Sequence, residues 1–252
     1  MKATAKKCRK ATGEKTMRSV SLLFKVLWSP GEAMFLLSKT PRVVAPLVFL
    51  SLMYLLTGAA TVMKLDTADM TIRAIERSPR GATMTDDQKQ LLRRQMSSPV
   101  VKVIGVCAAV IGPIMVILIV AAIYFVVFTM LGREGGFKAF LSITAFAFVP
   151  SIFRQLAVVL SAYTIPAASI MPDELGSLSP AVFVDRDALS PAVFAAINSI
   201  DLISIWILSL LIIGYGFLVR KSLSQATRVA VVVGVFLVYV VLRMGYAAIS
   251  GV

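Results

Sequence analysis

Residues 198–219, NSIDLISIWILSLLIIGYGFLV, form an apolar run that is long enough to cross a membrane. It carries one acid, Asp201, and no other long apolar run of the chain contains an acidic residue. An ionised side chain inside hydrocarbon costs about 2.5–3.5 kcal/mol on insertion scales, so Asp201 needs a partner, a wet cavity or a neutral form.

The composition around this run is that of a polytopic membrane protein. Hydrophobic residues make up 58% of the 252 residues and charged residues 15%, which leaves too little polar surface to cover a water-soluble globule. We therefore predict an all-α integral membrane protein with five transmembrane helices and short interfacial helices. The predicted transmembrane helices cover residues 43–63, 99–131, 139–165, 198–219 and 229–249.

The part of the chain before the first apolar run divides into two segments. Residues 1–18 carry seven Lys or Arg and one acid, which predicts a basic tail that is disordered or lies along anionic headgroups. Residues 19–42 are amphipathic and predict interfacial helices. Here Ser29, Pro30 and Glu32 have the spacing of a capping box, with Ser29 at N-cap and Pro30 at N1. Residues 43–252 then form the transmembrane domain.

Small residues and prolines indicate where helices pack and begin. Ala108 and Gly112 form a small-xxx-small pair, which suits either simple packing or the close approach of a neighbouring helix. The hexapeptide LSPAVF occurs at residues 178–183 and again at 189–194. Each copy places Ser before Pro in the order of N-cap and N1, so we predict two short helix starts. Acids precede bases in residues 86–96, which predicts a short surface helix.

The distribution of basic residues predicts the orientation of the chain. With a cytoplasmic N-terminus, fifteen Lys and Arg lie on the cytoplasmic face, and eight lie on the opposite face in two long loops rich in acids. Five crossings then place the C-terminus outside.

Three charged residues of the apolar runs are predicted to share one layer. The height of each residue above the cytoplasmic end of its helix is roughly 23 Å for Arg154, roughly 27 Å for Asp201 and roughly 21 Å for Arg243. We therefore expect Asp201 to pair with Arg154 or Arg243, with Gln155 available on the same helix as Arg154. The cluster is interpreted as a tie between helices, a site for an anionic group such as a lipid phosphate, or a proton or ion relay.

Several classes of function are excluded or disfavoured. The chain has no histidine, which excludes His-dependent triads and His-ligated zinc or haem. No catalytic set, metal site or cofactor site is predicted, and Cys8 and Cys107 are not expected to form a disulfide. The net charge of +13 is concentrated beside apolar runs, which indicates anionic lipid rather than nucleic acid as a partner. Other membrane proteins or a second copy of the chain are the expected protein partners.

Short motifs give the chain a resemblance to the Yip1 domain family in its bacterial form. Ser29-Pro30-Gly31-Glu32 with Phe35, followed by Pro41 and Pro46, resembles the opening of that domain. The segment 147–150, AFVP, is similar to its Pro-bearing helix. Asp201 with Ile205-Trp206 and Gly214 resembles its fourth helix, with Ile203 where an aromatic residue is usual.

The resemblance implies a five-helix membrane protein with a cytoplasmic N-terminus and no known enzymatic activity. Eukaryotic members of the family act in vesicle traffic and associate with Rab GTPases, but this chain has a short basic N-terminal region instead of a long cytosolic domain. A bacterial inner membrane is therefore the expected setting. The expected role is a scaffold or adaptor that supports an export or lipid-handling system. The alternative is a transporter or channel subunit with a polar site around Arg154, Asp201 and Arg243.

Overall fold

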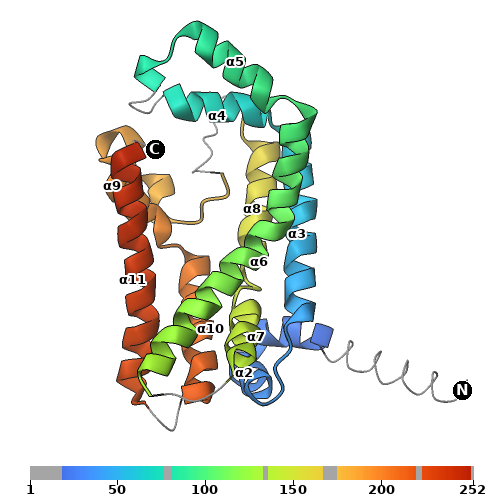
Figure 1. The fold of residues 1–252 in the computed structure, drawn as a ribbon, viewed down its shortest axis with the longest axis vertical. Coiled ribbons are helices and arrows are strands. Elements are labelled where there is room, and N and C mark those ends of the chain that lie inside the picture. Colours follow the sequence, from blue (N-terminus) through green and yellow to red (C-terminus); the bar gives the residue numbers. More distant parts are fainter. Residues whose placement is uncertain (1–18, 77–80, 133–135, 167–174, 220–222, 251–252) are drawn as a thin grey trace, which may run out of the picture. The chain divides into compact units, whose positions relative to one another are not determined.

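The protein is all-helical in the computed structural model, which describes residues 19–76, 81–132, 136–166, 175–219 and 223–250 (Figure 1). No strand occurs within these ranges. Among the same residues, five helical spans are long and apolar enough to cross a membrane: Val44–Lys64, Pro99–Met130, Phe137–Thr164, Leu202–Val219 and Gln225–Ser250. The predicted fold class is confirmed. The predicted basic tail, residues 1–18, lies outside the described residues.

The helices are joined by connections of different lengths, the stretch between Thr164 and Pro191 being a long one. A first helix covers Ser19–Trp28. The others are α2 (Pro30–Lys39), α3 (Val44–Lys64), α4 (Thr67–Glu76), α5 (Asp86–Met96), α6 (Pro99–Met130), α7 (Phe137–Ala147), α8 (Ser151–Thr164), α9 (Pro191–Ser199), α10 (Leu202–Val219) and α11 (Gln225–Ser250). Three 3-10 turns complete the described elements: η1 (Gly81–Thr83), η2 (Pro180–Phe183) and η3 (Arg186–Ala188).

The chain folds into two compact units. Unit 1 contains Met1–Leu50, Ile114–Pro150 and Ile207–Val232, and unit 2 contains Ser51–Pro113, Ser151–Trp206 and Val233–Val252. Four of the long helices, α3, α6, α10 and α11, contribute residues to both units.

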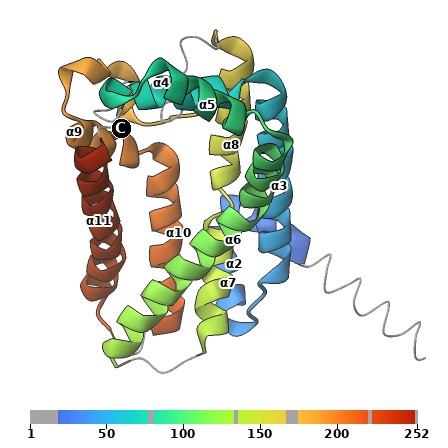
Figure 2. The ribbon, with the colours of Figure 1, turned by 45° about the horizontal axis from the view of Figure 1, so that its top comes forward.

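Unit 1 is built around a cluster of aromatic side chains from α6, α7 and α10. Tyr215 is fully buried, and its ring lies 5.0 Å from Tyr124, 5.6 Å from Phe128 and 5.1 Å from Phe140, between ring centroids. The Tyr215 hydroxyl is 2.7 Å from the Thr144 hydroxyl. Helix α2 packs beside α7 in the same unit (Figure 2).

Removing the Tyr215 hydroxyl tests the polar contact in this aromatic cluster. For Tyr215→Phe we expect a loss of about 1 kcal/mol in the free energy of unfolding, because one buried hydrogen bond is lost. Thr144 still donates to the Phe140 carbonyl at 2.8 Å, so the loss stays small. Thermal unfolding in mild detergent measures it. Tyr246→Phe, at an exposed residue, should leave the unfolding temperature unchanged, and an equal loss in both variants would contradict the prediction.

The start of α2 corrects the predicted capping box. Ser29 does precede the helix and Pro30 is its first residue, but the Ser29 side chain makes no capping hydrogen bond. Glu32 instead forms an ion pair with Lys25 of the preceding helix. This pairing occupies the carboxylate that a capping box would require.

The third predicted span is helical but broken. Helix α7 ends at Ala147, and α8 begins at Ser151. Pro150 has no backbone N–H to continue the helical hydrogen bonds, and its ring disfavours the α conformation of the residue before it. The helix is therefore interrupted at residues 148–150.

The fourth predicted helix, residues 198–219, is also two helices. Helix α9 ends at Ser199 and α10 begins at Leu202, so Asp201 lies just before α10 and not inside it. Its carbonyl accepts the N–H of Ile205 at 3.0 Å, and its carboxylate accepts the N–H of Ser204 at 2.6 Å. Asp201 is therefore the N-cap of α10, a position where a carboxylate satisfies free N–H groups and complements the helix dipole.

The two copies of LSPAVF begin helices, as predicted. Ser179 accepts the N–H of Ala181 at the start of η2, and Ser190 accepts the N–H of Val193 at the start of α9. The surface helix predicted at residues 86–96 is α5, which lies against α4 (Figure 2).

Helix α6 packs on a residue other than the predicted pair. Ala108 is exposed, and a Cβ added at Gly112 would meet nothing within 4 Å. In unit 2, α6 instead approaches α3 at the neighbouring residue, Ala109, whose Cβ lies 3.6 Å from the position of a Cβ added at Gly58. The expected small-xxx-small packing is therefore not made within the described part of the chain.

Candidate functional site

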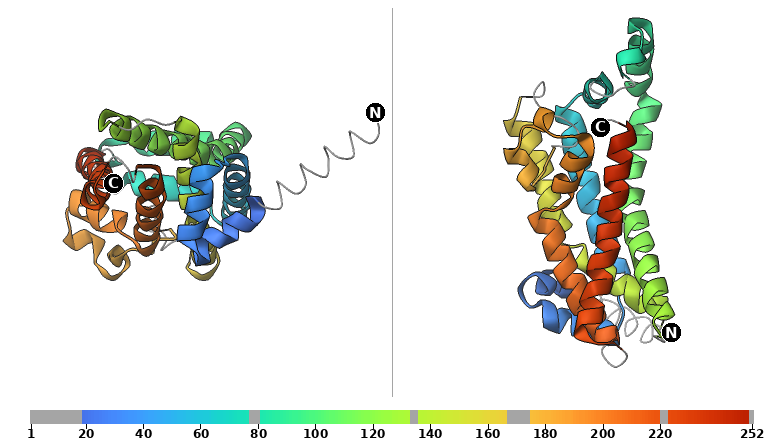
Figure 3. Two further views of the ribbon diagram at one scale, coloured as in Figure 1. Left: turned by 90° about the horizontal axis from the view of Figure 1, so that it is seen from below. Right: turned by 90° about the vertical axis from the view of Figure 1, so that its left-hand side faces the viewer.

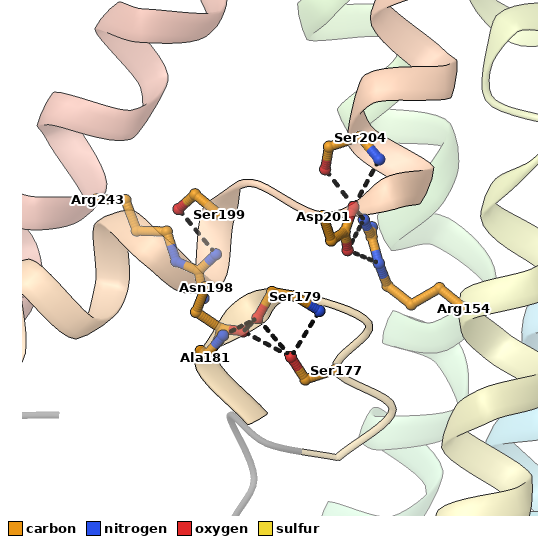
Figure 4. A network of polar contacts seen from close by, with 9 residues as sticks. All are labelled: Arg154, Ser177, Ser179, Ala181, Asn198, Ser199, Asp201, Ser204 and Arg243. Atoms are coloured by element: carbon orange, nitrogen blue, oxygen red, sulfur yellow. Dashed lines mark hydrogen bonds and ion pairs between the residues drawn. The ribbon is translucent and has the colours of Figure 1, made fainter. Parts of the chain in front are cut away.

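An ion pair between α8 and the start of α10 forms the centre of the candidate site in unit 2 (Figure 4). Two nitrogens of Arg154 donate three hydrogen bonds to the carboxylate of Asp201: Nη2 to Oδ2 at 2.6 Å and to Oδ1 at 2.8 Å, and Nε to Oδ2 at 3.1 Å. Arg154 also donates to the Ser204 hydroxyl at 3.1 Å. Asp201 is 5% exposed, so its charge is buried but fully hydrogen-bonded. The predicted pairing of Asp201 with Arg154 is confirmed.

The second predicted partner, Arg243 of α11, does not bind Asp201. Its Nη1 donates to the Ser199 hydroxyl at the end of α9, at 3.2 Å. Figures 1 and 3 show α9 beside the C-terminal part of α11, which explains this contact. Arg243 therefore belongs to the same neighbourhood but faces a neutral partner.

Gln155 does not belong to this cluster, which corrects the prediction. Its side-chain oxygen accepts the Thr57 hydroxyl of α3 at 3.2 Å. Successive residues of a helix point about 100° apart, so Arg154 and Gln155 cannot face the same neighbour. Gln155 therefore ties α8 to α3 while Arg154 faces α10.

A group of hydroxyls and one amide holds the segment between residues 175 and 201, in which η2 and η3 precede α9. The hydroxyls of Ser177 and Ser179 donate to the Asn198 side-chain oxygen, at 2.8 and 2.9 Å (Figure 4). The Ser199 hydroxyl donates to the Ala195 carbonyl at 2.6 Å. Buried backbone outside regular helices requires such partners, because its N–H and C=O groups have no helical ladder to join.

These groups line a cavity of about 160 Å³, which we name the arginine pocket. Arg154, Asp201 and Arg243 line it, together with Ser177, Asn198 and Tyr239. Gly176 shapes one wall. It has a φ of 69°, and a Cβ there would lie 2.4 Å from Val158 Cγ2 and 2.7 Å from Val158 N.

The charges of the arginine pocket indicate what it can do chemically. Arg154 and Asp201 neutralise each other, and no acid among the described residues pairs with Arg243, so the lining carries an excess positive charge. A single carboxylate held in a salt bridge is a poor general base. No group of three or more His, Cys, Asp or Glu that could hold a metal occurs in the described ranges. The arrangement suits binding of an anion.

Sequence reasoning missed Ser177, Asn198, Ser199 and Ser204 as members of the site. For Ser204 a signal was present, because an Asp directly before an apolar run is a candidate N-cap that accepts the N–H of the residue three positions on. The others lie on loop and helix-end segments whose position depends on tertiary contacts.

A family model of the Yip1 domain matches residues 24–244 of the chain. The chain belongs to the Yip1 domain family. No curated protein and no solved structure matched it in the other two comparisons. The Yip1 family is not known as a family of enzymes, and the five apolar spans make this member a multi-pass membrane protein.

The residues that carry the Yip1 resemblance have packing and capping roles. Asp201 caps α10 and pairs with Arg154. Trp206 stacks on Phe153 of α8, with centroids 5.7 Å apart and planes at 12°. In unit 1, a Cβ at Gly214 would lie 2.4 Å from Ile143 Cγ2, so α10 can approach α7 because this residue is glycine.

Proposed function

We propose that this Yip1-domain protein is a non-enzymatic scaffold or adaptor of a bacterial inner membrane. Its N-terminus lies in the cytoplasm and its C-terminus outside, as the excess of basic residues on the first face indicates. The basic N-terminal segment holds anionic headgroups, and the transmembrane helices bind other membrane proteins or a second copy of the chain. Such a protein supports an export or lipid-handling system.

The low burial of α6 is the observation that carries this proposal. The helix is 32 residues long, yet 6% of its apolar window is buried within the chain. On this open surface lie Ala108 and Gly112, with nothing within 4 Å of an added Cβ at Gly112. Small residues allow the backbones of two helices to approach closely, which is how transmembrane helices associate in lipid.

Substitution of Gly112 tests the adaptor proposal. We expect Gly112→Leu to lower the yield of co-purifying protein roughly tenfold, because a bulky side chain holds the partner helix away and such contacts contribute about 1–2 kcal/mol. The measurement is affinity purification in mild detergent with quantified partners. Cross-linking through the exposed Cys107, in a Cys8→Ser background, reports the same contact in intact membranes.

Gly234→Leu is the matched control for this experiment. Gly234 lies on α11, and a Cβ there also meets nothing within 4 Å, so the variant adds the same side chain to another open helical glycine. It should leave the partner yield at the wild-type level. A wild-type protein that purifies as a monomer without partners would contradict the adaptor role. A partner yield that neither substitution changes would contradict the role of Gly112 in it.

A transporter or channel subunit is the second candidate, and the arginine pocket favours it. The start of α10 lines the pocket, just after the helix is interrupted between α9 and α10. Transporters place substrate sites at such interrupted helices. Substrate-dependent flux in liposomes that contain the purified protein alone would favour this function over the adaptor.

A further inference from the structure

The arginine pocket contains a guanidinium whose charge the described residues leave unneutralised. Arg243 can offer five N–H donors, and the single hydrogen bond it makes in the described part of the chain goes to the Ser199 hydroxyl. Ser199 is 4% exposed, so this contact fixes one edge of the guanidinium against the end of α9. The remaining donors are available to a ligand in the cavity.

The acid beside Arg243 cannot supply the missing charge. The carboxylate of Asp201 accepts three hydrogen bonds from Arg154 and one from the Ser204 N–H. A carboxylate has about four acceptor sites, so these four hydrogen bonds occupy all of them. The positive charge of Arg243 therefore remains, and Tyr239 is a further residue of the pocket wall.

We propose that the arginine pocket binds a phosphate group, with Arg243 as its principal ligand. A guanidinium presents paired N–H groups that match two phosphate oxygens, and such charge-assisted bonds are stronger than neutral ones. The Arg154–Asp201 pair holds the wall of the site and leaves Arg243 as the residue that meets the anion. This binding function is additional to the adaptor role and does not depend on it.

The pocket lies at a depth where a lipid phosphate can reach it. Asp201 is the N-cap of α10, and Arg243 is roughly 10 Å along α11 from its last residue, Ser250. Both positions are near the ends of their spans, and an Arg side chain can extend further toward the headgroups. The phosphate can therefore belong to a lipid headgroup or to a soluble anion, and binding measurements distinguish these sources.

Binding to the full-length protein tests the proposal with two probes. The protein is reconstituted into nanodiscs of phosphatidylglycerol or phosphatidylcholine, and the lipid that it retains is measured by native mass spectrometry. Binding of inorganic phosphate is measured by calorimetry in detergent. We expect Arg243→Gln to lower the affinity for the probe roughly tenfold or more, because hydrogen bonds that involve a charged group are stronger than neutral ones. Preference for phosphatidylglycerol assigns a lipid, whereas binding of inorganic phosphate alone assigns a soluble anion.

Two further variants keep the test decisive. Arg243→Lys keeps the charge without the paired donors and should bind a few-fold more weakly than the wild type. Arg94→Gln, on the exposed side of α5, removes the same charge elsewhere and should bind as the wild type does. Wild-type protein that binds neither probe, or equal binding by wild type, Arg243→Gln and Arg243→Lys, would overturn the proposal. Gly112→Leu should leave phosphate binding intact, so the adaptor proposal can fail separately.

Discussion

Asp201→Ala should destabilise the protein by about 3–5 kcal/mol, the range for removing one partner of a buried ion pair. The substitution leaves Arg154, whose side chain is 33% exposed, largely buried without a counter-charge. It also removes the acceptor for the Ser204 N–H at the start of α10, which contributes about 1 kcal/mol. A lower unfolding temperature in detergent and a lower membrane yield measure the loss.

A double-mutant cycle separates the ion pair from the cap. Arg154→Met combined with Asp201→Ala should be more stable than Asp201→Ala alone, because no uncompensated guanidinium remains. Asp201→Asn keeps a capping oxygen and should lose less than Asp201→Ala. Additive effects of the two single substitutions would show that the pair is not coupled. Normal stability of Asp201→Asn with lost phosphate binding would assign the pair a role in the pocket instead of a tie.

Gly176→Ala should cost about 3 kcal/mol of unfolding free energy. A φ of 69° disfavours any side chain by about 1–2 kcal/mol. The added Cβ would also lie 2.7 and 2.9 Å from the backbone N and Cα of Val158. These atoms cannot move without disturbing the backbone hydrogen bonds of α8. Overpacking of this kind costs a further 1–3 kcal/mol or so. Thermal unfolding measures the sum.

Gly132→Ala isolates the conformational part of that cost. Gly132 has a φ of 83°, but a Cβ there meets nothing within 4 Å, so we expect a loss of about 1–2 kcal/mol from backbone strain alone. Equal losses for the two glycine variants would show that the approach of Gly176 to Val158 contributes nothing. Because Gly176 also shapes the arginine pocket, Gly176→Ala is expected to weaken phosphate binding, whereas Gly132→Ala is not.

The missed helix ends share a physical reason. Residues 191–197 and 202–219 are almost uniformly apolar, so periodicity gives no sign that α9 stops at Ser199 and α10 starts at Leu202. The break depends on which backbone groups find side-chain partners, and Asp201 provides one for Ser204. In the same way, Glu32 had two possible partners, and its position beside Lys25 decided against the capping box.

Composition and the lengths of the apolar runs are enough to give the class of protein and the number of its spans, because the transfer of apolar side chains into lipid depends on both. The sequence also limited the partners of Asp201 to the few cations of the apolar runs. The tertiary structure alone decided that Arg154 makes the pair, that Arg243 meets Ser199 and that Gln155 faces Thr57. Those choices depend on the rotation of each helix about its axis, which uniformly apolar helices do not encode in their hydrophobic pattern.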